Sequence, residues 1–190
     1  MAEHDPRENS RGKITAILLS GTVIVPDIRS SGELFSSFYG KPAGVDKPKP
    51  GDVSSPVILD PLEAVYLCES GIIRVVDSGG AEIGVDRLKA WARERLPRFD
   101  ELYPVYRDLR GRGFVVRSGL RYGSDFTVYR FGPGIDHSPY IVHVFPSQSK
   151  IDPVEIVKAG RLSHSVKKTF ILSTLEGGRP VYLMFKWFKP

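Results

Sequence analysis

The sequence predicts an α+β protein, with a small N-terminal α/β domain followed by a C-terminal mixed β-sheet domain flanked by helices. Two observations support this fold class. In the first half, helical apolar spacing alternates with short β-rich runs, whereas strand-like runs separated by tight turns follow Gly111. Pro97 separates two adjacent helical patterns and predicts a domain boundary, with domains at 13–97 and 98–190.

The first domain follows a polar, charged tail, residues 1–12, which we expect to be disordered. Asp60, Pro61 and Glu63 indicate a helix start, because Asp caps a helix, Pro fits its first position and Glu three residues later completes a capping box. The other elements expected here are a β-rich segment at 14–26 with a turn at Gly21, a strand at 72–76 and a helix from about 84 to 96.

Residues 39–56 contain four Pro, three Gly and three Lys, and this composition predicts a loop without a regular element. At 18 residues the segment is longer than most loops in compact domains. Loops of that length are commonly functional or disordered.

The second domain begins with a helical pattern from Phe99 to Leu109. Asp152 to Glu155 repeats the capped-helix signature, with Glu155 as the third residue of the box. The expected strands lie at 113–117, 126–130 and 140–145, followed by a hairpin of 169–175 and 181–188. We therefore expect a mixed sheet with a helix on each side.

The composition is that of a globular protein, with 41% hydrophobic and 26% charged residues. No apolar run approaches the roughly 18 residues of a membrane span, and the N-terminus lacks the apolar core of a secretory signal, so we expect a cytoplasmic protein. The single cysteine, Cys68, excludes an internal disulfide, and its apolar neighbours favour burial over reactivity. The scarcity of Asn and Gln indicates a thermophile.

The net charge of +5 is concentrated in the second half of the chain. Residues 1–98 hold 13 Lys and Arg against 14 Asp and Glu, whereas residues 99–190 hold 14 against 8. Basic residues interspersed with aromatic rings are typical of nucleic-acid binding, because cations attract phosphates and rings stack on bases. A solvated basic surface is the alternative.

Several chemistries can be compared by their motifs. The sequence has no phosphate-binding loop of the GxxxxGK[ST] type, and its four histidines lack metal-ligand spacing. A metal-dependent nuclease could use Asp125 and Glu155, although the capping box already accounts for Glu155. RNA can also be cut without a metal, because its 2′-hydroxyl is an internal nucleophile. The enzyme then needs a base for the hydroxyl proton, an acid for the leaving 5′-oxygen and a cation for the charge of the phosphorane.

A His, a Tyr and a Lys from separate strands would supply that metal-free chemistry. His137 lies in a polar turn, 134–139, where an imidazole that titrates near neutral pH is accessible. Tyr129 ends the preceding strand, and Lys167 and Lys168 precede the apolar strand at 169–175. Taken singly, each of these residues also fits a structural role.

Four segments resemble, in order, those of the archaeal tRNA-splicing endonuclease family, and together they span roughly residues 100–190. They are Tyr106 to Arg117, Gly119 to Tyr129, His137 to Val142 and Arg161 to Thr169. The resemblance implies a catalytic subunit with a C-terminal nuclease domain and a triad of Tyr129, His137 and Lys168. It assigns Tyr129 as the base on the 2′-hydroxyl, His137 as the acid on the leaving oxygen and Lys168 as the stabilising cation.

The same resemblance implies further RNA contacts. The family holds a flipped-out bulge base between two basic side chains, usually arginines, which correspond here to Arg161 and Lys186. Lysine lacks the planar guanidinium, so the second half of this clamp departs from the family. The loop 39–56 is similar to an insertion in some archaeal catalytic subunits that touches RNA, which makes Lys41, Lys47 and Lys49 candidates.

The implied substrate is precursor tRNA folded as a bulge–helix–bulge, with no cofactor or metal required and with 2′,3′-cyclic phosphate and 5′-hydroxyl products. The resemblance also implies an oligomer, and because the loop 39–56 resembles that of the hetero-oligomeric subgroup, we expect a heterotetramer with a structural, non-catalytic endonuclease subunit, or alternatively a homotetramer. An unpaired terminal strand at 181–188 would invite pairing with such a partner. Two other functions remain open at this point, a non-catalytic RNA-binding subunit and the metal-dependent nuclease.

Overall fold

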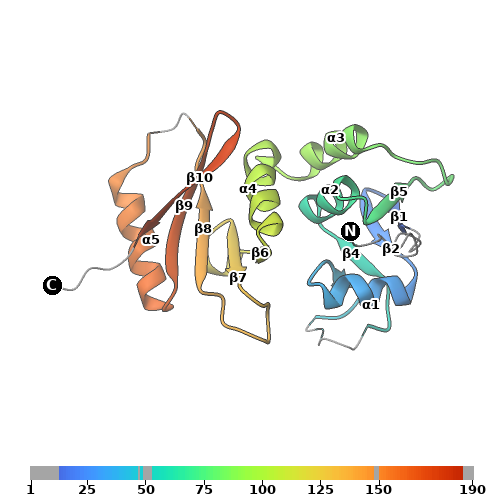
Figure 1. Cartoon of the computed structure of the whole chain (residues 1–190), viewed down its shortest axis with the longest axis horizontal. Helices are drawn as coiled ribbons and strands as arrows, with labels where there is room; N and C mark the ends of the chain where they lie inside the picture. The colour runs from blue at the N-terminus through green and yellow to red at the C-terminus, as the bar shows by residue number, and fades with distance from the viewer. Residues whose placement is uncertain (1–12, 47, 49–52, 148–149, 186–190) are drawn as a thin grey trace, which may run out of the picture. The chain divides into compact units, whose positions relative to one another are not determined.

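The computed structural model describes residues 13–46, 48, 53–147 and 150–185. The chain divides after Leu96 into two compact units, each with a five-stranded sheet and its own helices (Figure 1). The α+β fold class predicted from the sequence is confirmed. The expected tail at 1–12 lies outside the described residues. No helix in the described part of the chain is long and apolar enough to cross a membrane.

The N-terminal unit is built on a sheet with the strand order β3-β4-β2-β1-β5. β1 and β5 are parallel, and the other neighbours are antiparallel. Gly21 forms the predicted turn between β1 and β2, with a φ of 79° that favours glycine. The elements are β1 (Ile14–Leu19), β2 (Thr22–Val25), α1 (Ile28–Ser36), β3 (Lys41–Pro42), β4 (Val57–Leu59), α2 (Pro61–Glu69), β5 (Ile73–Val76) and α3 (Val85–Arg95).

The predicted capping box at the start of α2 is confirmed and has a second use. The Asp60 carboxylate accepts from Glu63 N at 2.9 Å, and Glu63 Oε2 accepts from Asp60 N at 3.1 Å. The other oxygen of Glu63 accepts from Gly40 N at 3.0 Å, so this buried carboxylate also fixes the start of the 39–56 loop. The prediction that this loop contains no regular element is wrong at its start, because β3 pairs with β4.

Helix α1 was not expected from the sequence. Asp27 caps it by accepting from Ser30 N at 2.8 Å. The buried Ser31 joins it to the sheet, since its hydroxyl donates to Val25 O at 2.8 Å and accepts from Val57 N at 3.1 Å. Cys68 in α2 is half-buried, and burial raises the pKa of its thiol, which disfavours the reactive thiolate.

The C-terminal unit contains a mixed sheet with the order β10-β9-β8-β7-β6. Only β8 and β9 are parallel among these neighbours, and α5 makes the crossover between them. The elements are α4 (Phe99–Gly111), β6 (Val115–Ser118), the 3₁₀ turn η2 (Leu120–Tyr122), β7 (Phe126–Tyr129), β8 (Tyr140–Val144), α5 (Pro153–Ser165), β9 (Thr169–Glu176) and β10 (Arg179–Phe185).

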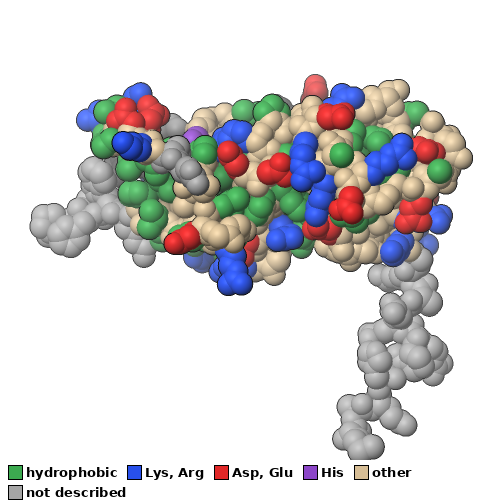
Figure 2. Space-filling view, turned by 90° about the horizontal axis from the view of Figure 1, so that it is seen from above, with side chains coloured by type: hydrophobic (Ala, Val, Ile, Leu, Met, Phe, Trp, Pro, Cys, Tyr) green, Lys and Arg blue, Asp and Glu red, His purple; other side chains and the backbone are tan. Residues whose placement is uncertain are grey.

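The two helices of this unit cover opposite faces of its sheet (Figure 1). Side chains alternate along each strand. Phe126 therefore faces α4 and packs on the Tyr106 ring at 6.2 Å, whereas Ile141 and Phe170 face α5. On the face drawn in Figure 2, Lys and Arg side chains are interspersed with Asp and Glu rather than gathered into one patch.

Candidate active site

The three residues predicted to act together lie at one end of the C-terminal sheet. Because β7 runs antiparallel to β8 and β9 runs parallel to it, the end of β7 meets the starts of β8 and β9. Tyr140, the first residue of β8, is paired on both sides. Continuing these two registers by one residue places Pro139, just before β8, between Tyr129 and Lys168, with their backbones roughly 10 Å apart across two strand spacings. His137 lies in the loop two residues before Pro139.

Lys168 is fastened to the loop that carries His137. Its Nζ donates to the carbonyl oxygen of Ser138 at 2.6 Å and contacts the hydroxyl of Ser138 at 3.2 Å. The same ammonium lies 5.1 Å from the centre of the Tyr122 ring, a cation–π contact. The preceding residue, Lys167, has a φ of 54° in the left-handed region, and it turns the chain from α5 into β9.

The other side of His137 is held by Asp136. This carboxylate accepts from Gly132 N at 2.7 Å and from Arg130 N at 3.0 Å, which closes the loop between β7 and β8. Burial would raise the pKa of Asp136, but hydrogen bonds from Gly132, Arg130 and other backbone groups outweigh it and lower the pKa. His137 therefore stands between two anchored neighbours, Asp136 and Ser138.

The exposure of the three side chains suits proton transfer at a surface. His137 is exposed, whereas Tyr129 and Lys168 are half-buried. An imidazole and a phenol are both able to act as proton donor or acceptor in catalysis, and an anchored ammonium offers a fixed positive charge. The arrangement can therefore support acid–base chemistry on a phosphodiester.

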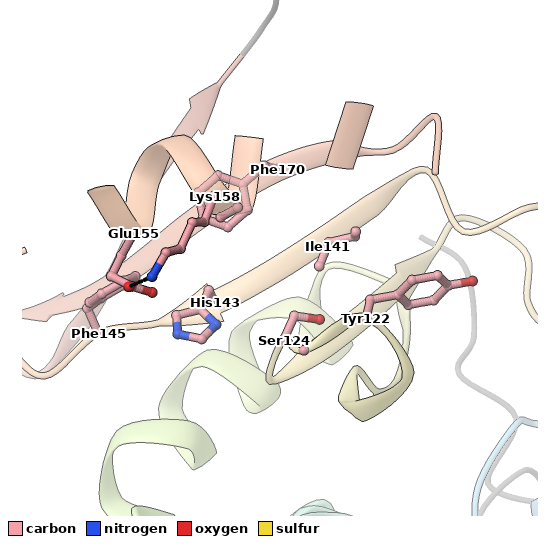
Figure 3. A pocket seen from close by; sticks show the side chains of 10 residues that line it. Tyr122, Ser124, Ile141, His143, Phe145, Glu155, Lys158 and Phe170 are labelled. Atoms are coloured by element: carbon pink, nitrogen blue, oxygen red, sulfur yellow. Dashed lines mark hydrogen bonds and ion pairs between the residues drawn. The ribbon is translucent and has the colours of Figure 1, made fainter. Parts of the chain in front are cut away.

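A pocket of about 160 Å³ opens beside Tyr122, between the sheet and α5 (Figure 3). Its floor comes from β8 and β9, and its sides come from η2 and α5. The lining residues are Tyr122, Gly123, Ser124, Ile141, His143, Phe145, Glu155, Lys158, Ala159 and Phe170. The pocket therefore shares Tyr122 with the surroundings of Lys168.

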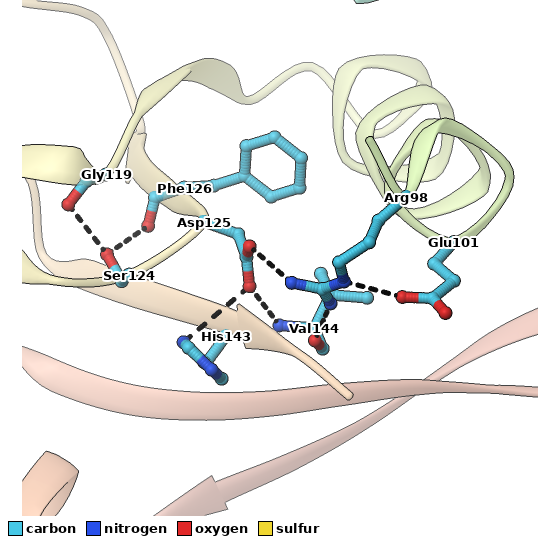
Figure 4. Close-up of polar contacts among 8 residues, drawn as sticks. All are labelled: Arg98, Glu101, Gly119, Ser124, Asp125, Phe126, His143 and Val144. Atoms are coloured by element: carbon cyan, nitrogen blue, oxygen red, sulfur yellow. Dashed lines mark hydrogen bonds and ion pairs between the residues drawn. The ribbon is translucent and has the colours of Figure 1, made fainter. Parts of the chain in front are cut away.

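Asp125, one of the two carboxylates considered for a metal site, is engaged in a network of protein contacts (Figure 4). It accepts from Arg98 Nη1 at 3.1 Å and from Val144 N at 2.7 Å, and it lies 3.6 Å from His143 Nδ1. Arg98 also bonds Glu101 and the carbonyl oxygen of Val144. These contacts tie the start of β7 to the end of β8 and to the start of α4.

The second carboxylate, Glu155, does not complete the predicted capping box. The Asp152 carboxylate accepts from Val154 N at 2.9 Å, while Glu155 N bonds the Asp152 carbonyl oxygen. The Glu155 carboxylate accepts instead from Lys158 Nζ at 2.8 Å. Within the described ranges, no three His, Cys, Asp or Glu side chains cluster in a way that could hold a metal ion.

The predicted RNA contacts fall in two groups. Arg161, on α5, and Lys41, in β3, are exposed side chains within the described residues. Lys47, Lys49 and Lys186 lie outside the described residues, so their positions are not given by the structure.

Three residues around the candidate triad were missed by the sequence reasoning. Asp136 follows a Gly-Pro-Gly turn, and an Asp at such a place commonly bonds nearby backbone N–H groups, a signal that could have identified it. Ser138 and Tyr122 carry no such local signal, because their partner Lys168 is 30 or more residues away.

Comparisons with known proteins cover both units of the chain. Residues 14–89 match the family model "tRNA intron endonuclease, N-terminal domain", and residues 99–182 match "tRNA intron endonuclease, catalytic C-terminal domain".

Relatives that extend over most of the chain carry the name "tRNA-splicing endonuclease". The protein of Hyperthermus butylicus is 49% identical over 181 residues, which are 93% of this chain and 99% of the relative. That of Saccharolobus solfataricus is 44% identical over 182 residues, with the same two coverages. A third relative, from Saccharolobus islandicus, is 39% identical over 180 residues, again with 93% and 99% covered.

Proposed function

This chain belongs to the tRNA intron endonuclease family, and we propose that it cleaves precursor tRNA at bulge–helix–bulge intron boundaries. The proposed reaction needs no metal and gives a 2′,3′-cyclic phosphate and a 5′-hydroxyl. The membership predicted from the sequence is confirmed, and with it the expectation of an RNA-cutting enzyme. The proposal concerns the bulge–helix–bulge geometry of the substrate, the metal-free reaction and the cyclic phosphate and 5′-hydroxyl ends of the products.

The observation that supports this reaction is the meeting of Tyr129, His137 and Lys168 at one end of the sheet. In the proposed step, Tyr129 takes the proton of the 2′-hydroxyl, whose oxygen attacks the adjacent phosphorus. The bond from phosphorus to the 5′-oxygen breaks, and His137 gives that oxygen a proton. Lys168 stabilises the negative charge of the phosphorane.

The hydrogen bonds that anchor Lys168 suit its proposed role of stabilising the phosphorane charge. An ammonium has three N–H donors, and Ser138 occupies positions for two of them. A third donor can then bond a phosphate oxygen without loss of the existing contacts. A charge fixed before the substrate arrives stabilises a transition state without the cost of reorganisation.

Outside the triad, the RNA would contact two exposed side chains, Arg161 on α5 and Lys41 near the start of the 39–56 loop. We also assign this role to Lys47, Lys49 and Lys186, by the resemblance alone. Phosphate contacts by the lysines of the 39–56 loop would position the substrate, whereas the bulge base held between Arg161 and Lys186 would provide recognition.

The assembly we propose is a heterotetramer with a non-catalytic endonuclease subunit, with a homotetramer as the alternative. β10 is at the edge of its sheet and exposes apolar side chains on both faces, with Leu183 54% exposed and Met184 48%. A long apolar edge strand is a ready site for pairing with another chain.

The test uses an end-labelled bulge–helix–bulge RNA in EDTA, with the full chain and with or without a partner subunit. Lys168→Gln is compared with Lys167→Gln, which removes the same charge from the neighbouring, exposed position. His137→Ala is measured alongside. We expect the wild type and Lys167→Gln to cut both bulges and leave cyclic phosphate, and Lys168→Gln and His137→Ala to lose at least a hundredfold in rate.

Two results would overturn the proposal. Loss of wild-type cleavage in EDTA would point to a metal-dependent site built on carboxylates such as Asp125. RNA binding without cleavage in every mixture, unchanged by His137→Ala, would identify a non-catalytic RNA-binding subunit.

A further inference from the structure

The pocket beside Tyr122 has no part in the proton transfers assigned above, yet it adjoins the residues that would perform them. Tyr122 lines the pocket, and its ring lies 5.1 Å from Lys168 Nζ. In Figure 3, Tyr122 lies at the end of the pocket opposite Phe145. A group held in this pocket would therefore be a near neighbour of a phosphate bound at Lys168.

The walls of the pocket suit a flat aromatic ring. Tyr122, Phe145 and Phe170 contribute three aromatic rings, and Ile141 and Ala159 contribute aliphatic groups. Any nucleic-acid base can stack on such rings, because every base has a flat π-face. Ala159 lies where α5 faces the sheet, and its small side chain leaves this space open.

The polar groups of the pocket lie where they could meet the edge of such a ring. His143 lines the pocket and is 35% exposed, with its ring 4.8 Å from that of Phe145. Asp125, fixed by Arg98 and by Val144 N, lies 3.6 Å from His143 Nδ1 (Figure 4). A Glu155–Lys158 ion pair of 2.8 Å also lines the pocket.

The size of the pocket selects among flat ligands. An apolar cavity of roughly 150 Å³ takes up benzene. A pocket of about 160 Å³ therefore holds a single six-membered ring, whereas the fused rings of a purine are larger.

We propose that this pocket binds one unpaired pyrimidine base of the RNA, from a nucleotide close to the scissile phosphate. The proposal rests on the proposed function, because it takes RNA as the substrate. The base would stack on the half-buried ring of Tyr122, with the buried Phe170 beneath it, and its polar edge would bond His143. The pocket would thus place the sugar-phosphate chain against Lys168.

Binding can be measured without cleavage. The full chain with labelled isoleucine methyl groups is titrated with uridine, and separately with adenosine, and the Ile141 methyl signal is followed by NMR. Ile73, buried in the other unit, is the internal reference. We expect uridine to shift Ile141 and leave Ile73 unchanged, and adenosine to have less than a third of that effect. No shift of Ile141 at the solubility limit of uridine, or an equal response to adenosine, overturns the proposal.

A pair of variants locates the binding. Ala159→Leu fills the pocket, whereas Gly160→Leu places the same side chain at the next residue of α5, where an added Cβ meets no atom within 4 Å. The uridine shift should vanish in Ala159→Leu and persist in Gly160→Leu. Unchanged Ile73 and Ile171 signals show that each variant is folded, and Ala159→Met replaces Ala159→Leu if it is not. Retention of the shift in a folded pocket-filling variant overturns the proposal.

Cleavage kinetics then separate the two proposals. With bulge–helix–bulge RNA, Ala159→Leu should raise KM about tenfold and change kcat less than threefold, because stacking of one base contributes a factor of that order to affinity. If the wild type binds uridine but does not cut the RNA, the proposed function fails and the pocket stands. If the wild type cuts and Ala159→Leu has the KM of Gly160→Leu, the pocket proposal fails and the function stands.

Discussion

At the scale of single residues, the candidate site depends on side chains to which the proposed mechanism gives no chemical role. Asp136 and Ser138 flank His137 and hold it from both sides, one through backbone N–H groups and the other through Lys168. Catalytic groups must be held close to their productive positions, since a small displacement costs a large factor in rate. In the proposed mechanism, the loop between β7 and β8 therefore serves to position His137.

Replacing Asp136 by Asn tests this positioning. The amide keeps one acceptor oxygen, so one of the two backbone bonds is lost, and we expect kcat to fall about tenfold with KM within twofold. Cleavage is measured under single-turnover conditions, and unfolding by circular dichroism. The control is Asp77→Asn in the other unit, where a single carboxylate oxygen accepts both backbone bonds, from Gly79 and Ala81, so the amide oxygen can keep both. Equal kcat values for the two variants would show that the loop has no positioning role.

The lowered pKa of Asp136 makes the acid behaviour of the loop predictable. A group with a depressed folded pKa contributes stability that is present above its unfolded pKa, about 3.9, and that is lost as pH falls through the folded value. The backbone amide signals of Arg130 and Gly132 should therefore stay constant from neutral pH down to about pH 4 and shift only below it. Shifts of both signals between pH 7 and 5 would contradict the assignment.

The sequence identified the residue types of the site but not their contacts. His137 in a polar turn and Tyr129 at a strand end are local features, and the resemblance named Lys168. The bond from Lys168 to Ser138 joins positions 30 residues apart and depends on which strands are neighbours. No local pattern contains that information.

At the scale of elements, helix α2 shows how one buried charge can serve two segments. Glu63 is 3% exposed and accepts from both Asp60 N and Gly40 N. A buried carboxylate without such donors would be strongly disfavoured. Here the Glu63 carboxylate caps the start of α2 and also anchors the beginning of the 39–56 loop.

Replacing Glu63 by Ala should lower the free energy of unfolding by about 2 kcal/mol, because the buried Gly40 N–H loses its acceptor and the helix loses half of its capping box. Urea unfolding measures the change. Glu33→Ala, which removes an exposed carboxylate 3.6 Å from Arg29, should change it by less than about 0.5 kcal/mol. Similar losses in the two variants would mean that the Gly40 contact contributes little.

Element positions were predictable where a strong local signal existed. The caps at Asp60 and Asp152 and the strand-like runs at 126–130 and 140–145 gave the right elements. Helix α1 was missed because Ser30, Ser31 and Gly32 weaken its helical pattern, and it is held by tertiary bonds of Ser31. Strands β3 and β4 are two and three residues long, too short for periodicity to detect.

At the scale of the whole molecule, the chain has two sheets, each with its own core. Strand order and the single parallel pairing in the second sheet are properties of the complete fold, and the sequence alone left the order undetermined. Only long-range packing decides which strand lies next to which. The candidate site depends on this packing, because it requires β7, β8 and β9 to be neighbours.

The exposed face of β10 gives a prediction about assembly. Leu183→Lys places a charge on the apolar edge strand and should reduce a self-associated or partner-bound species to the monomer, because charged side chains on an edge oppose strand pairing. Light scattering after size-exclusion chromatography measures this. Leu120→Lys changes an 85% exposed leucine in η2 and should leave association unchanged. Equal masses for Leu183→Lys and wild type in an associating mixture would exclude β10 from the interface.

The parallel pairing of β8 and β9 limits how descendants of this chain can change. Were β9 reversed, its first residues would lie at the far end of the five-residue β8, roughly 16 Å from the loop that carries His137. A parallel neighbour needs a crossover of a dozen or more residues, and α5 supplies it. Point substitutions on the surface of α5 would therefore keep this crossover. Deletion of the helix would leave room only for an antiparallel hairpin, and descendants with that deletion would lose the pairing that brings Lys168 to the loop of His137.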